Sequence, residues 1–327
     1  MNIKHTLLLS GLALAGFVNT VYAVENAAPC VSYAEAAWFL NGESPYQAFT
    51  KCRSGSIVSD PHITTFNGIA YDHNFPGDYA LVALQDGTGF AINGRFIFDK
   101  ANTVSAYTIP KAIQFNWSEH SLEIHRSEDS TLVFLDGAPV KVKNNGKVAI
   151  GDVGYIQRKD KSYLIANTQS DIATVVNVNK FYVDINVTVP SETDTVGLLG
   201  QPFSLGLLDG NGVALPVTDD SSDTGLGHVT RADFIEFIES WRLTNDNLFA
   251  TEELPALPDY SAKIYRLADL STKRMDKAQT KCEALEAELP ERFDLNNCLF
   301  DMGFGGSKFS VSAHRAQPSS LRLNILE

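Results

Sequence analysis

The residues at 59–82 carry side chains whose types and close spacing could do chemistry. This stretch reads SDPHITTFNGIAYDHNFPGDYALV and holds two histidines, three aspartates and an Asn-Gly pair. Zinc sites use histidine and aspartate as ligands, and neighbouring carboxylates orient the imidazole rings. One hypothesis is therefore a metal-dependent hydrolase that uses His62 and His73 with Asp60 and Asp72.

The spacing of these residues matches none of the common catalytic patterns. The two histidines flank a predicted turn, and the chain has no His-Glu-x-x-His or Gly-x-Ser-x-Gly sequence. The glycine-rich stretch at 197–206 lacks the lysine of a phosphate-binding loop. We prefer the interpretation in which His62 is a structural hydrogen-bonding residue at a strand start and His73 lies on the surface. The chain is then expected not to be an enzyme.

The beginning of the chain predicts export. Lys4 gives a basic start, an apolar run follows at 7–17, and Val-Tyr-Ala at 21–23 fits a cleavage site. We expect a signal peptide at residues 1–23, of a short type that resembles bacterial leaders, with cleavage after Ala23. No later segment reaches about 18 unbroken apolar residues, so no membrane span is expected. The location would be periplasmic, cell-surface or extracellular.

The charge of the chain excludes some classes of partner. The net charge of −13 becomes −14 once the leader removes the single positive charge of Lys4. A chain this acidic is a poor ligand for nucleic acid and for anionic lipid surfaces, because their phosphates require basic patches.

The four cysteines, at positions 30, 52, 282 and 298, predict disulfides. An even number of cysteines in an exported chain is typical of disulfide bonding, and four cysteines allow three pairings. We prefer the pairing Cys30–Cys52 and Cys282–Cys298, which closes the shortest loops. Each bond would stabilise the fold by roughly 3 kcal/mol through the entropy of the unfolded chain.

The sequence pattern in the middle of the chain is typical of a β-protein. Short apolar or β-branched runs such as DYALVAL, SLEIHR, TLVFL, VKVKNN, SYLIAN, ATVVNV and YVDINVTV alternate with turn dipeptides. These dipeptides are Asn67-Gly68, Asp86-Gly87, Asn93-Gly94, Asp136-Gly137, Asn145-Gly146, Asp209-Gly210 and Asn211-Gly212. Strands at a spacing of about 8–12 residues, joined by hairpin turns, predict a mainly β fold of the antiparallel sandwich or barrel type.

Helices are expected on both sides of this region. VSYAEAAWFL at 31–40 has helical spacing, with Tyr33, Ala37 and Leu40 on one face. TRADFIEFIESWRL at 230–243 places apolar residues on one stripe, and STKRMDKAQTKCEALEAEL at 271–289 is a third helix. The residues of the apolar stripe are Phe234, Phe237, Ile238 and Trp241.

Three motifs resemble the von Willebrand factor type D domain. The stretch at 59–82 is similar to its opening motif, VGLLGQ at 196–201 to its Gly-Leu-x-Gly-Asn element, and FIESWRLTNDNLF at 237–249 to its closing segment. The segment with Cys282 and Cys298 is similar to the two-cysteine unit that follows such domains in exported proteins. The matching fold-signature residues are Asp60, His62, Gly68, Tyr71, Asp72, Gly197, Gly200 and Trp241.

The resemblance divides the chain and implies an antiparallel β-sandwich with disulfide-stapled helical segments at both ends. After the signal peptide at 1–23 we expect a small helical disulfide segment at 24–54 and a type D-like β-domain at 55–249. A helix with the two-cysteine unit then occupies 250–316, and 317–327 is a loose tail.

The resemblance also implies a calcium site, from which this sequence departs. Calcium takes six to eight oxygen ligands, several of them carboxylates. The family's positions fall on Asn67, Gln201 and Ser204, and Phe203 cannot bind a cation, so a degraded site is expected and no other cofactor. An acidic loop could supply carboxylates instead, although a solvated loop is the preferred interpretation. The residues of this loop are Asp209, Asp219, Asp220 and Asp223.

The function implied is extracellular binding or adhesion, with a protein or a surface glycan as partner. A structural role in a surface or matrix assembly is the other non-enzymatic alternative. Val-Gly-Leu-Leu at 196–199 stands where the family's Cys-Gly-Leu-Cys supports multimer formation, so disulfide-linked multimers are not expected.

Overall fold

The structure of the protein is a computed structural model. It describes residues 29–41, 51–98, 107–127, 130–204, 206–218, 225–244, 248–249, 265–288, 293–306 and 321–326. The predicted signal peptide and its cleavage site lie outside these residues.

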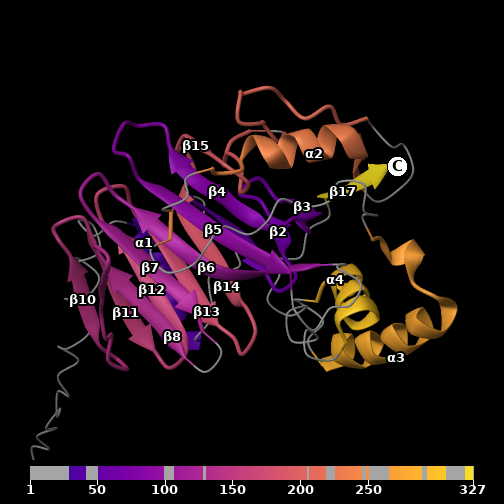
Figure 1. The fold of residues 1–327 in the computed structure, drawn as a ribbon, viewed down its shortest axis with the longest axis horizontal. Coiled ribbons are helices and arrows are strands. Elements are labelled where there is room, and N and C mark those ends of the chain that lie inside the picture. The colour runs from indigo at the N-terminus through magenta and orange to yellow at the C-terminus, as the bar shows by residue number, and fades with distance from the viewer. Residues whose placement is uncertain are drawn as a thin grey trace, which may run out of the picture.

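Two β-sheets pack face to face and form most of the described chain (Figure 1). The ten-stranded sheet has the order β10 (Lys147–Ile150), β11 (Gly154–Lys159), β12 (Ser162–Asn167), β13 (Ile172–Val178), β14 (Val183–Pro190), β1 (Cys52–Val58), β2 (His62–Thr64), β3 (Ile69–Asp72), β17 (Leu321–Leu326) and β16 (Gly225–Thr230). The seven-stranded sheet has the order β15 (Thr195–Val196), β4 (Gly77–Leu84), β5 (Ala91–Phe98), β6 (Thr108–Asn116), β7 (Ser121–Arg126), β8 (Thr131–Leu135) and β9 (Ala138–Pro139). The predicted mainly β sandwich is confirmed.

The core lies between the two sheets and follows from alternation along the strands. Inward-facing residues of both sheets, such as Ile57, Ile185, Leu81 and Phe115, are fully buried in one apolar cluster. Neighbouring strands are joined by tight turns, as at Asp136-Gly137, where both residues have positive φ of 53° and 76°. Such turns match the twist of the flanking strands, so the Asp-Gly signal in the sequence corresponds to a real hairpin.

Two of the local strand and turn predictions are wrong. Asn93-Gly94 is not a turn but lies inside β5, where the Asn93 side chain donates to Gln114 Oε1 at 3.1 Å. A Cβ at Gly94 would lie 3.0 Å from a Leu81 methyl carbon, so glycine is needed for close packing here and not for a turn. VKVKNN at 140–145 forms no strand, and β10 begins only at Lys147.

The prediction of a loose tail at 317–327 is wrong for its last part. β17 inserts between β3 and β16 and pairs in parallel with both, whereas the other strand pairs in the two sheets are antiparallel. Parallel neighbours must be distant in sequence because they need a long connection. A distant parallel pairing of this kind needs no hairpin turn beside the strand, so the sequence around 321–326 does not indicate it.

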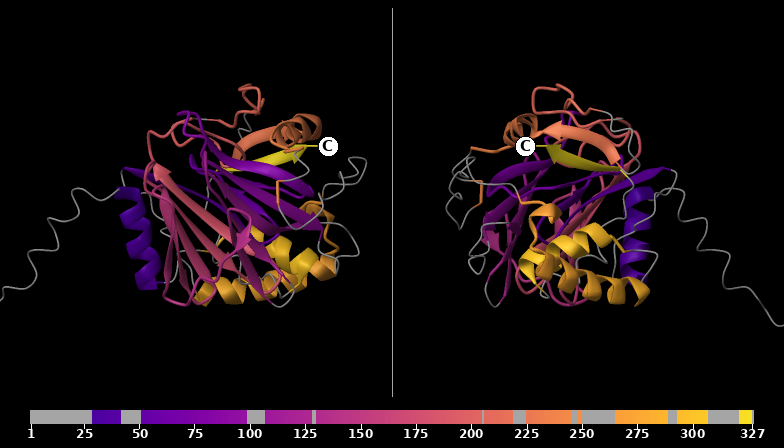
Figure 2. Two further views of the ribbon diagram at one scale, coloured as in Figure 1. Left: turned by 60° about the vertical axis from the view of Figure 1, so that its left-hand side comes forward. Right: turned by 90° about the vertical axis from the view of Figure 1, so that its right-hand side faces the viewer.

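Helix α1 (Pro29–Asn41), in the predicted N-terminal disulfide segment, packs against the sandwich. It packs on the outer face of the larger sheet (Figure 2), and Trp38 Nε1 donates to Ser162 Oγ of β12 at 2.7 Å. The buried face holds Val31, Ala34 and Trp38, whereas the predicted Tyr33 and Ala37 are partly exposed. The side chain of the third predicted residue, Leu40, lies outside the described part of the chain. Because the segment is apolar around most of its circumference, spacing alone could not identify the buried face.

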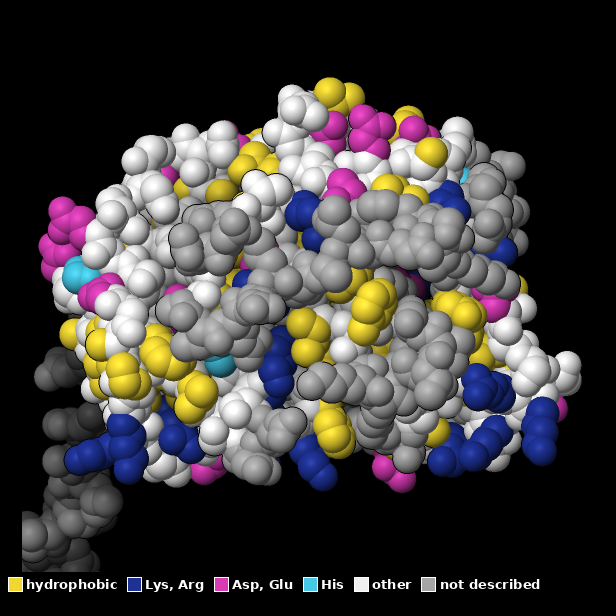
Figure 3. Space-filling view, viewed as in Figure 1, with side chains coloured by type: hydrophobic (Ala, Val, Ile, Leu, Met, Phe, Trp, Pro, Cys, Tyr) yellow, Lys and Arg dark blue, Asp and Glu magenta, His cyan; other side chains and the backbone are white. Residues whose placement is uncertain are grey.

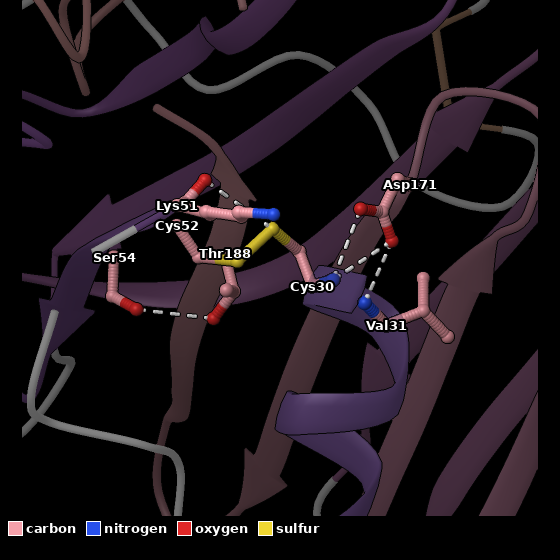
Figure 4. The surroundings of a disulfide bond; sticks show 7 residues. All are labelled: Cys30, Val31, Lys51, Cys52, Ser54, Asp171 and Thr188. Carbon is pink, nitrogen blue, oxygen red and sulfur yellow. Dashed lines mark hydrogen bonds between the residues drawn. A yellow bond between two sulfur atoms is a disulfide. The ribbon is translucent and has the colours of Figure 1, made fainter. Parts of the chain in front are cut away.

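The first disulfide joins α1 to the start of β1 (Figure 4). Asp171, in the turn before β13, accepts hydrogen bonds from the backbone N–H groups of Cys30 at 3.0 Å and Val31 at 2.9 Å. A carboxylate at a helix N-terminus satisfies free donors and matches the helix dipole. The predicted pairing Cys30–Cys52 is confirmed, as is the pairing Cys282–Cys298.

The other helices lie toward the end of the chain. Their bounds are α2 (Arg231–Ser240), the 3₁₀ turn η1 (Leu267–Asp269), α3 (Thr272–Glu288), α4 (Leu295–Phe300) and the π-helical turn η3 (Asp301–Gly305). The predicted apolar stripe of α2 is confirmed, since Phe234, Phe237 and Ile238 are buried. The second disulfide ties α3 to α4. No helix among the described residues is long and apolar enough to cross a membrane.

Candidate functional site

The β2–β3 hairpin and the turn before it bring three titratable side chains together. His62 lies opposite Asp72 in the antiparallel register. Residues paired in this way project from the same face of a sheet, so the two side chains meet. His62 Nδ1 lies 2.8 Å from Asp72 Oδ1, and Asp60, in the turn after β1, places Oδ1 3.3 Å from His62 Nε2.

Two further charged residues come from the C-terminal part of the chain. Asp301, the first residue of η3, places Oδ1 2.7 Å from His62 Nε2. Arg322 of β17 donates from Nη2 to both oxygens of Asp72, at 3.0 Å and 2.8 Å. We call this set the buried charge cluster. It consists of Asp60, His62, Asp72, Asp301 and Arg322.

The close packing of these charged groups shifts the pKa values of several members of the cluster. Burial alone lowers the pKa of His62, but the carboxylates of Asp301 and Asp60 outweigh burial and hold this pKa well above its usual value. Burial raises the pKa of Asp301 well above its usual value, and the neighbouring Asp60 carboxylate adds to the rise. For Asp72, burial is outweighed by Arg322 and His62, so its pKa lies well below the usual range. A proton on Asp301, which its raised pKa favours, would leave the cluster without net charge.

The cluster is enclosed on the side where His62, Asp60 and Asp301 meet. These side chains are 2%, 0% and 0% exposed, and Phe300 packs edge-on to the imidazole ring at 6.2 Å. A cavity of about 400 Å³ is lined by Asp72, Phe300 and Arg322, but none of the three inner groups lines it. A substrate cannot reach the three inner groups, so the geometry does not support hydrolysis at His62.

His73 does not join His62, which corrects both hypotheses made for it. The side chain is fully buried and is not on the surface. Its ring packs against Tyr79 at 4.5 Å and Phe96 at 4.7 Å, and neither ring nitrogen has a hydrogen-bond partner among the described residues. Burial, and to a smaller degree the charge of Arg242, lowers the pKa of His73 to about 3. A neutral imidazole in an aromatic pocket is a packing residue.

His73 is expected to make the fold acid-sensitive. Its pKa is about 3 in the folded chain and about 6.5 in the unfolded chain. At pH values between these two pKa values, His73 is protonated in the unfolded chain and neutral in the folded chain. The free energy of unfolding is therefore highest above about pH 6.5 and falls by about 1.4 kcal/mol for each pH unit below it. Urea unfolding of wild type and His73→Leu, from about pH 7 to pH 4, measures the difference. The other titratable groups are the same in wild type and in His73→Leu. If the free energies of unfolding of the two proteins change with pH in parallel, the prediction is wrong.

The positions equivalent to the family's calcium ligands do not fit a calcium ion. Asn67 Nδ2 donates to the carbonyl oxygens of Ser204 at 2.8 Å and Gly206 at 3.3 Å, so an amide N–H faces the oxygens that a cation would need. Thr65 Oγ1 donates to Asn67 Oδ1, which occupies that oxygen as well. Gln201 turns away and donates to Asp194 at 3.0 Å. A set of neutral oxygens already paired with N–H and O–H donors cannot replace the carboxylates that calcium prefers.

The acidic-loop alternative is only partly described. Asp209 Oδ1 accepts the backbone N–H groups of Asn211 at 2.9 Å and Val213 at 2.8 Å, so it shapes an exposed turn. The other three acidic residues, Asp219, Asp220 and Asp223, lie outside the described residues.

The remaining fold-signature residues hold the opening hairpin against the loop at 196–200. Tyr71 OH donates to Leu198 O at 2.6 Å. Gly197 has φ of 121°, and a Cβ there would lie 2.6 Å from Leu81 O. Gly68 and Gly200 have positive φ of 85° and 68°. Trp241 follows α2, and its Nε1 donates to Leu208 O at 3.2 Å.

A second candidate site lies where the two sheets meet and was not found from sequence. An open cavity of about 470 Å³ is bordered by residues from both sheets. We call it the basic pocket. Its lining residues are Arg126, Ser130, Thr131, Arg158, Lys161, Tyr163, Val178, Asn179 and Lys180. The four cations come from three separate segments, β7, the β11–β12 hairpin and the turn after β13, so the RKDK run at 158–161 by itself does not indicate the pocket.

The sequence reasoning also missed Asp301 and Arg322 as members of the buried charge cluster. Asp301 lies three residues after Cys298, in the segment that resembles the family's two-cysteine unit. Arg322 fell in the segment that was expected to be a tail.

Comparison with known proteins agrees with the opening hairpin and the 196–201 loop. Residues 55–201 match the family of the von Willebrand factor type D domain. The chain is also 25% identical over 158 residues to Mucin-4 from Homo sapiens, which covers 44% of this chain and 3% of that protein. The chain therefore spans a small part of this relative's length. Type D modules and disulfides are both typical of extracellular proteins. This chain is therefore a protein that contains a von Willebrand factor type D domain, at residues 55–201.

Proposed function

We propose that this protein is an exported, non-catalytic adhesion protein that binds acidic surface glycans through the basic pocket. One observation carries the proposal. Among the described residues that line the pocket, Arg126, Arg158, Lys161 and Lys180 are cations and none is Asp or Glu. The chain as a whole has a net charge of −13. A positively charged pocket is therefore a local exception on this protein, and it attracts anionic groups.

The arginines of the pocket are held in fixed orientations. Arg158 Nε donates to Asp160 O at 2.8 Å, Nη1 donates to Val142 O at 3.2 Å, and the guanidinium lies 5.6 Å from the Tyr163 ring centroid. Arg126 donates from Nη1 to Ser130 O at 2.9 Å. Carbonyl acceptors orient a guanidinium plane while adding no formal negative charge. Arg126 contributes mainly its positive charge, because its Nε and Nη2 donate to the backbone oxygens of Asn179 and Lys180. An oriented guanidinium such as that of Arg158 suits the oxygens of a sulfate or carboxylate group.

The other lining groups favour a sugar over an acidic peptide. Ser130, Thr131 and Asn179 add hydroxyl and amide groups beside the cations. Sugar hydroxyls require such partners, which both donate and accept hydrogen bonds. Exposed lysines 161 and 180 stand at the rim, where they can meet further anionic groups along a polymer. In the view of Figure 3, many Lys and Arg side chains lie toward the lower edge of the molecule, whereas Asp and Glu side chains are seen at the top, at the left and below.

Two observations support a non-catalytic and non-covalent role. The acid–base groups at the centre of the buried charge cluster are almost completely buried, so a substrate cannot contact them. All four cysteines are paired within the chain, so none is available to link copies through disulfides. Binding would therefore depend on surface recognition.

The test is binding of heparin-derived oligosaccharides, measured by titration calorimetry at low and raised salt. Lys161→Gln/Lys180→Gln is expected to weaken binding by about tenfold or more, since each lost charge-assisted hydrogen bond contributes about 1.5–3 kcal/mol. The two lysines are exposed, so the fold should be unaffected. Raised salt should weaken binding of the wild type, because the attraction is between charges.

The matched control is Lys273→Gln/Lys277→Gln on the exposed face of α3, which removes the same charge elsewhere. It should bind within about twofold of wild type. Equal losses in both double variants would show that only net charge matters and would overturn the pocket assignment. Tighter binding of polyglutamate than of heparin fragments would overturn the preference for glycans.

A further inference from the structure

We infer that Asp60, His62 and Asp301 form a buried binding site for a divalent transition-metal ion such as zinc. Each of the three offers one ligand atom, and these atoms lie within 4.8 Å of one another. One imidazole nitrogen and two carboxylates are ligand types that zinc accepts. A hard cation such as calcium would require more oxygens and no nitrogen.

The Asp60 carboxylate is the observation that points to an ion. Both of its oxygens are buried and receive no hydrogen bond from the described residues, and the residue is 0% exposed. A buried carboxylate without donors is costly, because it loses the hydrogen bonds that water gave it. Its Oδ1 already faces His62 Nε2 at 3.3 Å, and this nitrogen lies 2.7 Å from Asp301 Oδ1. An ion between these atoms would satisfy all of them.

The charges balance when a dication is present. The ion would neutralise the carboxylates of Asp60 and Asp301, with His62 as a neutral ligand. Asp72 and Arg322 form a second neutral pair at 2.8 Å. Buried charges are tolerated when they are paired in this way or bind metals.

His62 is oriented as a metal ligand would be. Its Nδ1 contacts Asp72 Oδ1 at 2.8 Å, and Arg322 holds that carboxylate in place through both oxygens. When Nδ1–H donates to a carboxylate, the lone pair of Nε2 points toward the ion, and metal-binding histidines use this arrangement widely. A cavity of about 400 Å³ is lined by Asp72, Phe300 and Arg322, and the first two of these contact the His62 side chain.

Such an ion would connect the sandwich to the C-terminal disulfide unit. Asp60 and His62 belong to the β1–β2 turn and β2, whereas Asp301 follows α4, which Cys298 ties to α3. The ion would therefore act as a structural crosslink between segments that are 239 residues apart at the His62–Asp301 contact.

The test is zinc content after the full-length protein is stripped with EDTA and dialysed against zinc chloride. Wild type is expected to retain about one zinc ion per chain and to gain about 5 °C or more in Tm over the stripped protein. Asp60→Asn should retain less than about a tenth of that zinc. In EDTA the same variant should melt no lower than wild type, because asparagine has nearly the same shape as aspartate and removes a buried carboxylate that receives no hydrogen bond from the described residues. Cobalt(II) in place of zinc should give visible absorption bands in wild type only.

The matched control is His120→Gln/Asp136→Asn, which removes a histidine–aspartate pair at 3.0 Å on the surface. It should bind zinc as wild type does. A folded wild type that retains no zinc would overturn the inference, as would zinc retained equally by Asp60→Asn. The Asp60 variant keeps the test valid if substitutions at His62 or Asp301 prevent folding.

Discussion

A chain that ends at Ser320 is expected to lose more than about 3 kcal/mol of its free energy of unfolding. The truncation removes β17 from between β3 and β16, and with it the buried Leu323 and the Arg322 guanidinium that holds Asp72. Burial of a leucine contributes about 1.5–3 kcal/mol, and removing one partner of a largely buried ion pair costs about 3–5 kcal/mol. Guanidinium chloride unfolding measures the loss.

The substitution Arg322→Lys separates the two contributions. It keeps the strand and the positive charge but loses the paired donation to Asp72, so its loss should be smaller than that of the truncated chain. Equal stability of truncated and full-length chains would mean that residues 321–327 are the loose tail that the sequence suggested.

Replacing Asp78 by alanine is expected to destabilise the fold by about 3–5 kcal/mol. Asp78 and Arg95 lie opposite each other on β4 and β5 and form two hydrogen bonds of 2.8 Å. Both side chains are almost completely buried, and the Arg95 guanidinium lies 4.6 Å from the Phe249 ring centroid. Removing the carboxylate leaves a buried cation without its main counter-charge. Chemical denaturation of the variant measures the loss.

The double variant Asp78→Leu/Arg95→Met is the control for this pair. Replacing both charges with apolar groups of similar volume is often neutral, so the double variant should recover most of the stability. If it is as unstable as Asp78→Ala, the loss comes from packing and not from the unpaired charge.

Local features of this protein could be predicted because they depend on near neighbours in the sequence. Alternating strands such as SYLIAN at 162–167 and the hairpin at Asp136-Gly137 follow from the two-residue period of a strand and from turn chemistry. The buried stripe of α2 follows from helical spacing. Both disulfides join cysteines that are near in sequence, at separations of 22 and 16 residues.

Predictions failed where a tertiary contact overruled a local signal. Asn93-Gly94 reads as a turn, yet the pair lies in the middle of a strand because Leu81 and Phe96 leave no room for a side chain at Gly94. His73 reads as a surface residue, yet Tyr79 and Phe96 enclose it. In each case a deciding neighbour belongs to another strand, Leu81 of β4 for Gly94 and both aromatic residues for His73, and its position depends on the register of the whole sheet.

By itself, then, the sequence predicted the mainly β sandwich, most of its hairpin turns and the preferred disulfide pairing. Its resemblance to the type D domain also marked Asp60 and His62 as fold-signature residues. Only the tertiary structure decided what surrounds them. Asp301 and Arg322 reach His62 and Asp72 from 239 and 250 positions away, and the cations of the basic pocket come from both sheets. Contacts at such separations leave no periodicity in the chain, because they arise when whole sheets and helices pack against each other.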